Sequence, residues 1–352
     1  MEVNDLLKLF CADNQIVELE NWIKKSEGNL NVTDAEGSLR AILLSAIYKN
    51  NAKRLIFIHD NAESAGYFYH DLMQLLKKND NLLFFPSAFR SSKIDKVDAA
   101  NEILRTETLT KINDPNEPFL VVTYPEALIE PIVKKSELKE KTIHLNKGDM
   151  VDLSEIEKLL IDLGFSRVDF VYEPGQFSVR GSLIDVFSFS SEYPYRIDFF
   201  GDEIDSIRTF DVENQLSKAL KDSLDIVPDL HSSVEEELFF EVLPNDVLFA
   251  FSNYRLVIDC FKAIFEQKEF LSDLFSFTNV MESLKRFRKV NLSKNAIFTD
   301  AKILSFPSSL QPAFNKNFDL LSENLTQLEK DGYKIFFLSD SKHQLDRLNA
   351  IF

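Results

Sequence analysis

Residues 172–215 read YEPGQFSVRGSLIDVFSFSSEYPYRIDFFGDEIDSIRTFDVENQ, the densest run of strand and turn signals in the chain. Alternating apolar and polar side chains are typical of half-buried strands. Gly201 and Asp202 form a two-residue hairpin signal, and Gly181, isolated in the strand pattern, indicates a bulge or a close backbone approach. The expected strands are residues 177–180, 183–187, 195–200 and 203–210.

The alternation assigns the side chains of the third expected strand to two faces. Ile197 and Phe199 fall on the core face, which leaves Arg196 and Phe200 on the polar face. Arg180 alternates with apolar neighbours in its own strand, so it too is expected to face solvent. Two arginines and a phenylalanine on one exposed sheet face have the composition of a protein-binding hot spot.

An alternative explains the same residues without a partner. In this interpretation, Arg196 forms a surface ion pair with Asp198 or Glu203, and another part of the chain covers Phe200. Truncation of Phe200 separates the two, because it removes partner binding in the first interpretation and lowers the melting temperature in the second. The sequence pattern alone leaves both open.

The same stretch resembles the hairpin domain shared by the excision-repair subunit UvrB and the transcription-repair coupling factors, the Mfd family. The shared pattern is G-x-F-x-x-R-G-x-x-x-D-x-F, followed by R-x-x-F-F-x-x-E-I-x-S-I-R-x-F-D. One loop position departs from it, since Ser188 stands where the family usually has proline. The resemblance implies that Arg180, Arg196 and Phe200 bind a partner, UvrA. The matching residues are Gly175, Phe177, Arg180, Gly181, Asp185, Phe187, Arg196, Phe199, Phe200, Glu203, Ile204, Ser206, Ile207, Arg208, Phe210 and Asp211.

The composition limits what else the chain is expected to do. Its 352 residues predict two or three domains, and its formal net charge of -17 makes DNA binding at physiological salt negligible. The best basic cluster, residues 286–289, is interpreted as one solvated turn of a helix. Cys11 and Cys260 have no metal-ligand or disulfide spacing, and no histidine has a catalytic partner at a useful spacing. Without a signal peptide or a long apolar run, a cytoplasmic location and no membrane contact are expected.

Residues 34–41 occupy the place where a nucleotide-binding protein carries its phosphate loop. A working loop needs glycine at both ends of the turn, a lysine for the phosphates and a hydroxyl for magnesium. Here Arg40 aligns with the lysine, and Asp34 and Glu36 would face a triphosphate. No ATP or magnesium is therefore expected to bind this chain. The Mfd family has a degenerate loop at this place, and the matching residues are Gly37, Ser38, Arg40 and Ala41.

Apolar strands alternate with helices on both sides of the hairpin stretch, which predicts a parallel sheet covered on both faces. The resemblance implies a degenerate P-loop NTPase (RecA-like) domain of the UvrB type, formed by two segments, with an inserted α+β hairpin domain. The expected domains are residues 1–141 (UvrB-like domain 1a), 142–228 (UvrA-binding hairpin domain 2) and 229–352 (domain 1b, which completes the α/β domain). In the last segment, the expected strands are 238–243, 247–251, 297–298 and 333–338, and the expected helices are 254–267, 272–286, 314–330 and 341–352.

The resemblance implies an amino-terminal UvrB-homology module, an adaptor that recruits UvrA to RNA polymerase stalled at a DNA lesion in nucleotide excision repair. Full-length members of the family are ATP-dependent DNA translocases. This chain has neither an intact phosphate loop nor an Asp-Glu-x-x-His run, so it is not expected to be an enzyme. The ATP-driven motor, with its ATP and magnesium, and the contacts with RNA polymerase and double-stranded DNA are expected further along the full-length protein.

Two other functions remain to be compared with the adaptor. One is a UvrB-like, nucleotide-dependent subunit that loads onto damaged DNA, and the composition of the 34–41 loop argues against it. The other is a stand-alone binding module with no repair role, which a tight complex with UvrA would exclude.

Overall fold

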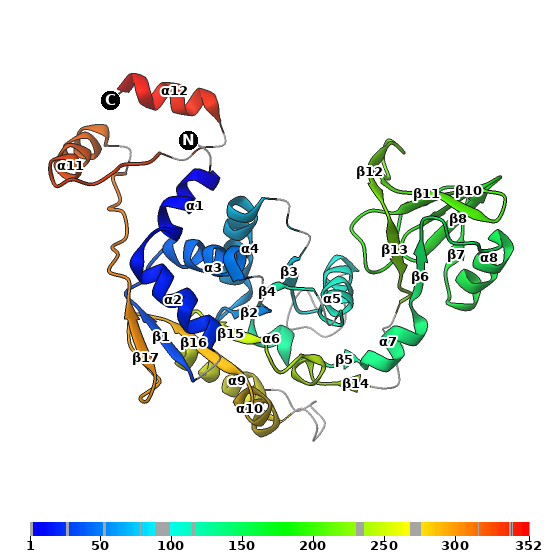
Figure 1. Ribbon diagram of the computed structural model, residues 1–352, viewed down its shortest axis with the longest axis horizontal. Helices are drawn as coiled ribbons and strands as arrows, with labels where there is room; N and C mark the ends of the chain where they lie inside the picture. Colours follow the sequence, from blue (N-terminus) through cyan, green and yellow to red (C-terminus); the bar gives the residue numbers. More distant parts are fainter. Residues whose placement is uncertain are drawn as a thin grey trace. The chain divides into compact units, whose positions relative to one another are not determined.

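The computed structural model divides the chain into two compact units, residues 1–308 and residues 309–352 (Figure 1). Among the described residues, none of the helices combines the length and the apolar character that a membrane span requires. The structure describes residues 3–25, 28–51, 54–77, 79, 81–88, 99–114, 117–229, 236–267, 276–315, 317–337, 339 and 341–351.

Seven parallel strands form the central sheet of the first unit, in the order β17-β1-β16-β15-β2-β4-β3. Strands from before and after the hairpin stretch are therefore interleaved in one sheet. Every residue of β1, β2, β4 and β15 is buried, as expected for a parallel sheet covered on both faces. The strands are β1 (Leu30–Thr33), β2 (Leu55–Ile58), β3 (Leu82–Phe85), β4 (Leu120–Thr123), β15 (Leu248–Phe251), β16 (Arg288–Leu292) and β17 (Lys302–Ser305).

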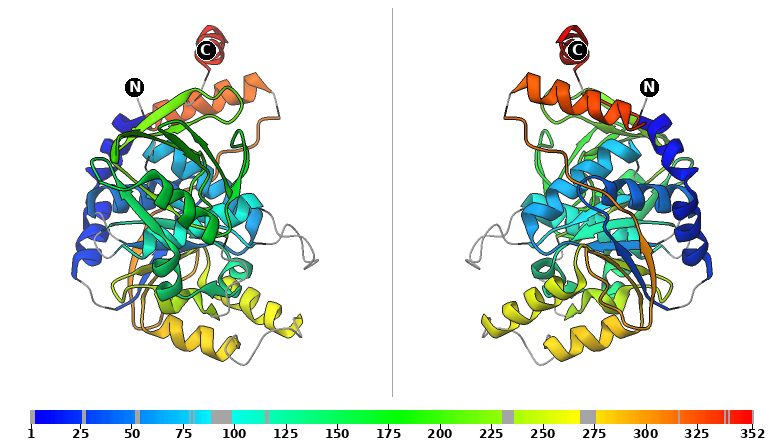
Figure 2. Two further views of the ribbon diagram at one scale, coloured as in Figure 1. Left: turned by 90° about the vertical axis from the view of Figure 1, so that its right-hand side faces the viewer. Right: turned by 90° about the vertical axis from the view of Figure 1, so that its left-hand side faces the viewer.

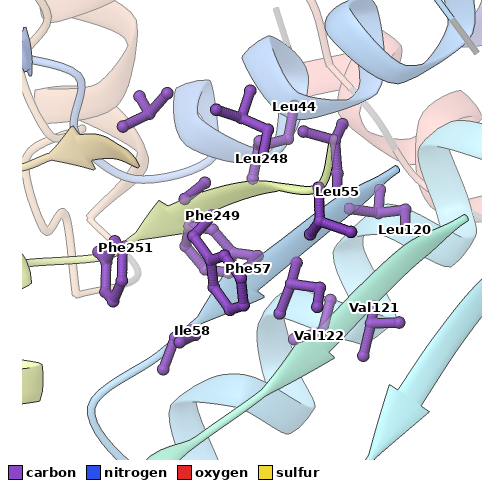
Figure 3. Packing of buried hydrophobic residues seen from close by; sticks show 14 of the residues in the cluster. Leu44, Leu55, Phe57, Ile58, Leu120, Val121, Val122, Leu248, Phe249 and Phe251 are labelled. Carbon is purple, nitrogen blue, oxygen red and sulfur yellow. The ribbon is translucent and has the colours of Figure 1, made fainter. Parts of the chain in front are cut away.

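Helices cover both faces of this sheet, with α3 and α4 on one side and α9 and α10 on the other (Figures 1 and 2). Between them, side chains of β2, β4 and β15 pack against one another, among them the buried Phe57, Val122 and Phe249 (Figure 3). The helices are α1 (Val3–Cys11), α2 (Asn14–Lys25), α3 (Leu39–Asn51), α4 (Ala62–Leu76), α5 (Ala99–Ile112), α6 (Pro125–Leu128), α9 (Tyr254–Gln267) and α10 (Phe277–Lys285).

The hairpin stretch lies in an inserted α+β domain with a core of its own. A six-stranded sheet, in the order β12-β11-β10-β9-β8-β7, packs one face on helix α8 (Leu153–Asp162). The predicted α/β class with an inserted domain is thus confirmed, and the four predicted strands match within a residue or two. The strands of this sheet are β7 (Ser166–Arg167), β8 (Gln176–Arg180), β9 (Leu183–Val186), β10 (Tyr195–Phe200), β11 (Glu203–Phe210) and β12 (Ser217–Lys221).

Two short ladders flank the inserted domain. The first pairs the strand that enters the domain with the strand that leaves it, and the second joins the two chain segments next to the α/β domain. The remaining elements are β5 (Ile132–Val133), α7 (Lys135–Lys141), β6 (Ile143–Asn146), β13 (Ser223–Ile226), β14 (Glu236–Glu237) and the 3-10 helix η1 (Phe239–Val242); β6 pairs with β13 and β5 with β14.

Three predictions for the segment after the inserted domain are wrong. The strand expected at 238–243 is the 3-10 helix η1, in which the Phe239 ring packs 4.5 Å from the Phe85 ring. The strand expected at 297–298 is absent from the described residues there, and β17 lies further on. Residues 286–289 are no solvated helical turn, because Arg288 opens strand β16 and stacks 4.2 Å from the Trp22 ring.

The second unit also differs from expectation. Strands β15 to β17 complete the sheet of the first unit, and residues 309–352 form the second unit. This unit holds helices α11 (Phe318–Lys330) and α12 (Lys342–Ile351). Residues 333–337 are not assigned to a strand in the part of the chain that the structure describes, and their aromatic side chains are exposed. The last residue of the strand expected at 333–338 lies outside the described residues, as do residues 272–275 of the helix expected at 272–286.

Candidate partner-binding site on the inserted domain

The two faces of the six-stranded sheet differ as the alternation predicts. On β10, Ile197 and Phe199 are buried in the domain core, together with Ile207 of the neighbouring strand. Phe200 points to the opposite face and is 82% exposed. This contradicts the interpretation in which another part of the chain covers the phenylalanine. It remains a prediction that a partner binds there.

A tight turn and a bulge set the orientation of Phe200. Gly201 has φ 66°, the left-handed conformation that a two-residue hairpin turn requires, and Phe200 pairs with Glu203 across the turn. The register shifts between Asp198 and Phe199, where Asp205 is the extra residue on the return strand. Gly181, at φ 62°, lies in the turn between β8 and β9. Neither alternative predicted for Gly181 holds, because the bulge lies between β10 and β11 and no other described segment approaches within 4 Å of the place where a Cβ of Gly181 would lie.

Asp185 organises the polar part of this face, although only 1% of its side chain is exposed. Arg196 donates from Nε to Asp185 Oδ1 at 2.7 Å and from Nη2 to Oδ2 at 2.8 Å, a two-pronged ion pair. Arg196 also donates to the backbone and side-chain oxygens of Gln215 and stacks 4.4 Å from the Phe210 ring. The hydrogen bond with Asp185 raises the pKa of Arg196. Arg196 therefore makes four hydrogen bonds within the domain, and its side chain is only 14% exposed.

Arg180 reaches the same carboxylate from the neighbouring strand. It forms an ion pair with Asp185, and its guanidinium lies 5.1 Å from the ring of Phe170, itself 47% exposed. Its side chain is 36% exposed, whereas its Nε is buried and has no hydrogen-bond partner among the described residues. The exposed part of the Arg180 side chain can receive an acceptor from outside, whereas Arg196 mainly holds Asp185 in place. The sequence predicted a different carboxylate, Asp198 or Glu203, for Arg196, and that prediction is wrong.

Sequence reasoning did not single out Arg208 as a site residue. Arg208 lies directly opposite Arg196 on β11, so both point to the same face. Its side chain is 26% exposed, with one long ion pair of 3.9 Å to Asp198 and a 3.3 Å hydrogen bond to Ser206. The alternation along the return strand was the signal that could have found it, because Ile207 beside it is a core residue.

The degenerate loop follows β1 and is closed by the end of the first unit. Ser308 Oγ donates to the carbonyl oxygen of Asp34 at 2.6 Å and accepts from the Glu36 amide at 2.8 Å. Ser305 Oγ donates to the Asp34 carboxylate at 2.9 Å. One of the loop amides that a phosphate would need is therefore bonded within the chain.

Arg40 also turns toward the loop. Its Nε donates to the carbonyl oxygen of Ala35 at 2.8 Å, and burial lowers its pKa, an effect that Glu36 and Asp60 partly oppose. Gly37 has φ 55° and Ser38 precedes α3, whose third residue is the buried Ala41. In the part of the chain that the structure describes, no cluster of histidine, cysteine or acidic side chains is placed to hold a metal ion.

Comparison with known proteins identifies the inserted domain. Residues 143–231 match the UvrB interaction domain family. The chain resembles the transcription-repair coupling factors. It is 30% identical to that of Bacillus subtilis over 193 residues, which are 54% of this chain and 16% of the relative. It is 24% identical to that of Staphylococcus aureus (strain USA300) over 340 residues, 96% of this chain and 28% of the relative.

A third relative, the transcription-repair coupling factor of Escherichia coli, is 26% identical over 208 residues, 58% of this chain and 18% of the relative. The chain thus spans less than a third of the length of these curated relatives. The matched family covers β6 to β13, so it includes the whole sheet that carries Arg180, Arg196 and Phe200.

Proposed function

We propose that this chain is an adaptor module of a bacterial transcription-repair coupling factor, which recruits UvrA to RNA polymerase stalled at a DNA lesion. The observation that carries the proposal is the exposed Phe200 on the same sheet face as Arg180, in a sheet that lies within the UvrB interaction domain match. The similarity to transcription-repair coupling factors over most of the chain supports the repair context. ATP, magnesium, RNA polymerase and double-stranded DNA are proposed to be bound by other parts of the full-length protein.

The site is proposed to bind UvrA through two kinds of contact. Phe200 buries apolar area in the partner and excludes water from the charged pairs beside it. Arg180 offers the exposed part of its side chain to a carboxylate of the partner. Arg196 contributes by holding Asp185, which orients Arg180, because four of the five Arg196 N–H donors are already used within the domain.

A nucleotide-dependent, UvrB-like role is disfavoured by the contacts of the 34–41 loop. The Glu36 amide is bonded to Ser308, and the Arg40 side chain is bonded to a loop carbonyl. Two carboxylates, those of Asp34 and Glu36, belong to the same loop and would repel a triphosphate. We infer that the chain works without a bound nucleotide.

Titration of purified UvrA into the purified chain tests the proposal. Phe200→Ala and Arg180→Ala are expected to weaken the complex about thirtyfold, the effect of removing one anchor worth about 2 kcal/mol. Ile161→Ala is the matched control, because Ile161 is 54% exposed on α8, which covers the opposite face of the sheet. If folded Phe200→Ala and Arg180→Ala variants bind UvrA as the wild-type chain does, the proposed site is wrong.

A further inference from the structure

The chain segment that precedes α8 adds an edge to the six-stranded sheet. Met150 forms a β-bridge with Glu203, the residue that pairs with Phe200 across the hairpin. Backbone hydrogen bonds hold this segment against the turn, from Val151 N to Asp202 O at 2.8 Å and from Ile204 N to Asp149 O at 2.9 Å. Backbone hydrogen bonds therefore fix the position of residues 149–151 beside the hairpin, and this position does not depend on their side chains.

The register places three side chains in one row on the exposed face. Residues directly opposite each other in an antiparallel ladder point to the same side, so Met150, Glu203 and Phe200 share a face. Met150 is 71% exposed and Phe200 82%, with the exposed Glu203 between them. Ile204, the next residue, is buried on the other side, as this arrangement requires.

We propose that Met150 is a second apolar anchor of the partner-binding face, acting together with Phe200 from a segment 50 residues earlier in the chain. The inference rests on the proposed function, since it concerns the same face, and it specifies the chemistry of the partner surface. Methionine is flexible and polarisable, which suits it to filling irregular space beside an aromatic anchor.

The charged residues on this face define the rest of the complementary surface. Burial of Met150 and Phe200 removes water from Glu203, so the partner must supply a lysine or arginine there to satisfy the carboxylate. Arg180, a cation whose side chain is 36% exposed, calls for a carboxylate. The partner surface that fits this face has an apolar hollow for Met150 and Phe200. It also has a basic side chain opposite Glu203 and, at the edge of the hollow, an acidic side chain for Arg180. The opposite signs at Glu203 and Arg180 then set the orientation of the complex.

The test is a double-mutant cycle with UvrA, the partner proposed above. Met150→Ala is expected to weaken binding about tenfold and Met150→Leu to retain it, because shape and apolar character are kept. Glu203→Lys should also weaken binding, because the introduced positive charge would repel the basic side chain that the partner is proposed to place there. The Met150→Ala and Phe200→Ala effects should not be additive, since the two side chains enter one hollow. Ile161→Ala, on the other side of the domain, should change nothing.

The outcomes separate this inference from the proposed function. Suppose that Phe200→Ala weakens binding while Met150→Ala and Glu203→Lys bind as the wild type does. Met150 and Glu203 then do not contact the partner, so this inference is wrong, although the proposed function stands. If Phe200→Ala and Arg180→Ala also bind as the wild type does, the proposed function fails as well. Met150→Ala is expected to stay folded because its side chain is 71% exposed, and circular dichroism checks this.

Discussion

Replacement of Asp185 by asparagine is the perturbation that most directly tests how this sheet face is built. Asp185 is only 1% exposed and accepts hydrogen bonds from both Arg196 and Arg180. Asparagine keeps the shape but loses the charge, so two arginines lose their counter-ion and one amide N–H faces an arginine donor. Removal of one member of a buried ion pair costs about 3–5 kcal/mol, and we take the lower end, about 3 kcal/mol, because Arg180 is partly exposed.

Hydrogen exchange followed by mass spectrometry measures the loss of stability of this sheet separately from the rest of the chain. A loss of about 3 kcal/mol corresponds to roughly 150-fold faster exchange in peptides that span β8 to β11. The α/β domain should keep its stability, and the single tryptophan, Trp22, reports on it by fluorescence because it is buried in that domain. The exchange rate of β8 to β11 and the Trp22 melting curve should therefore respond differently to Asp185→Asn.

Asp198→Asn is the matched control on the same face. The Asp198 side chain is 34% exposed and lies 3.9 Å from Arg208, so its loss should cost about 1 kcal/mol or less. The reasoning fails if Asp185→Asn exchanges at the wild-type rate, or if Asp198→Asn accelerates exchange as much as Asp185→Asn does.

Three further predictions concern other parts of the chain. Calorimetry is expected to detect no ATP binding at micromolar concentrations, because Ser308 and Arg40 occupy groups of the degenerate loop; binding that Arg40→Ala abolishes would overturn this. The hydrogen bond with Asp225 (2.6 Å) raises the pKa of His144 above 6.5, so its stabilising effect is fully present below pH 6.5 and is lost as the pH rises through the raised pKa. An NMR titration should show a lower pKa of His144 in Asp225→Asn, and an unchanged value would argue against this assignment. Finally, a chain that ends at residue 308 should melt within about 2 °C of the whole chain by Trp22 fluorescence, since residues 309–352 form a separate unit; a fall of about 10 °C or more would show that the units depend on each other.

Local patterns in the sequence were enough to predict the hairpin region. Strand period, turn residues and face assignment depend on side chains one or two positions apart, so they can be read without knowing the fold. Phe199 and Phe200, adjacent in sequence, were assigned to opposite faces, and the structure confirms the assignment. The α/β class was predictable in the same way, from apolar strands that alternate with helices, whereas the assembly of one sheet from two segments was implied only by the family resemblance.

Tertiary structure decided which side chains meet. The strand register brings Asp185 to Arg196, which the sequence paired with Asp198 or Glu203, and the edge segment brings Met150 beside Glu203. The sequence predicted that Arg288 and Lys289 are exposed to solvent. Their actual environment depends on residues far away in the sequence, since Arg288 stacks on Trp22 and the Lys289 amide donates to Asn29. Closure of the degenerate loop by Ser308 is equally non-local, 272 residues from Glu36. Whether a charged residue forms a structural ion pair or stays available for binding therefore depends on which distant segment packs against it. The local sequence pattern cannot show which segment that is.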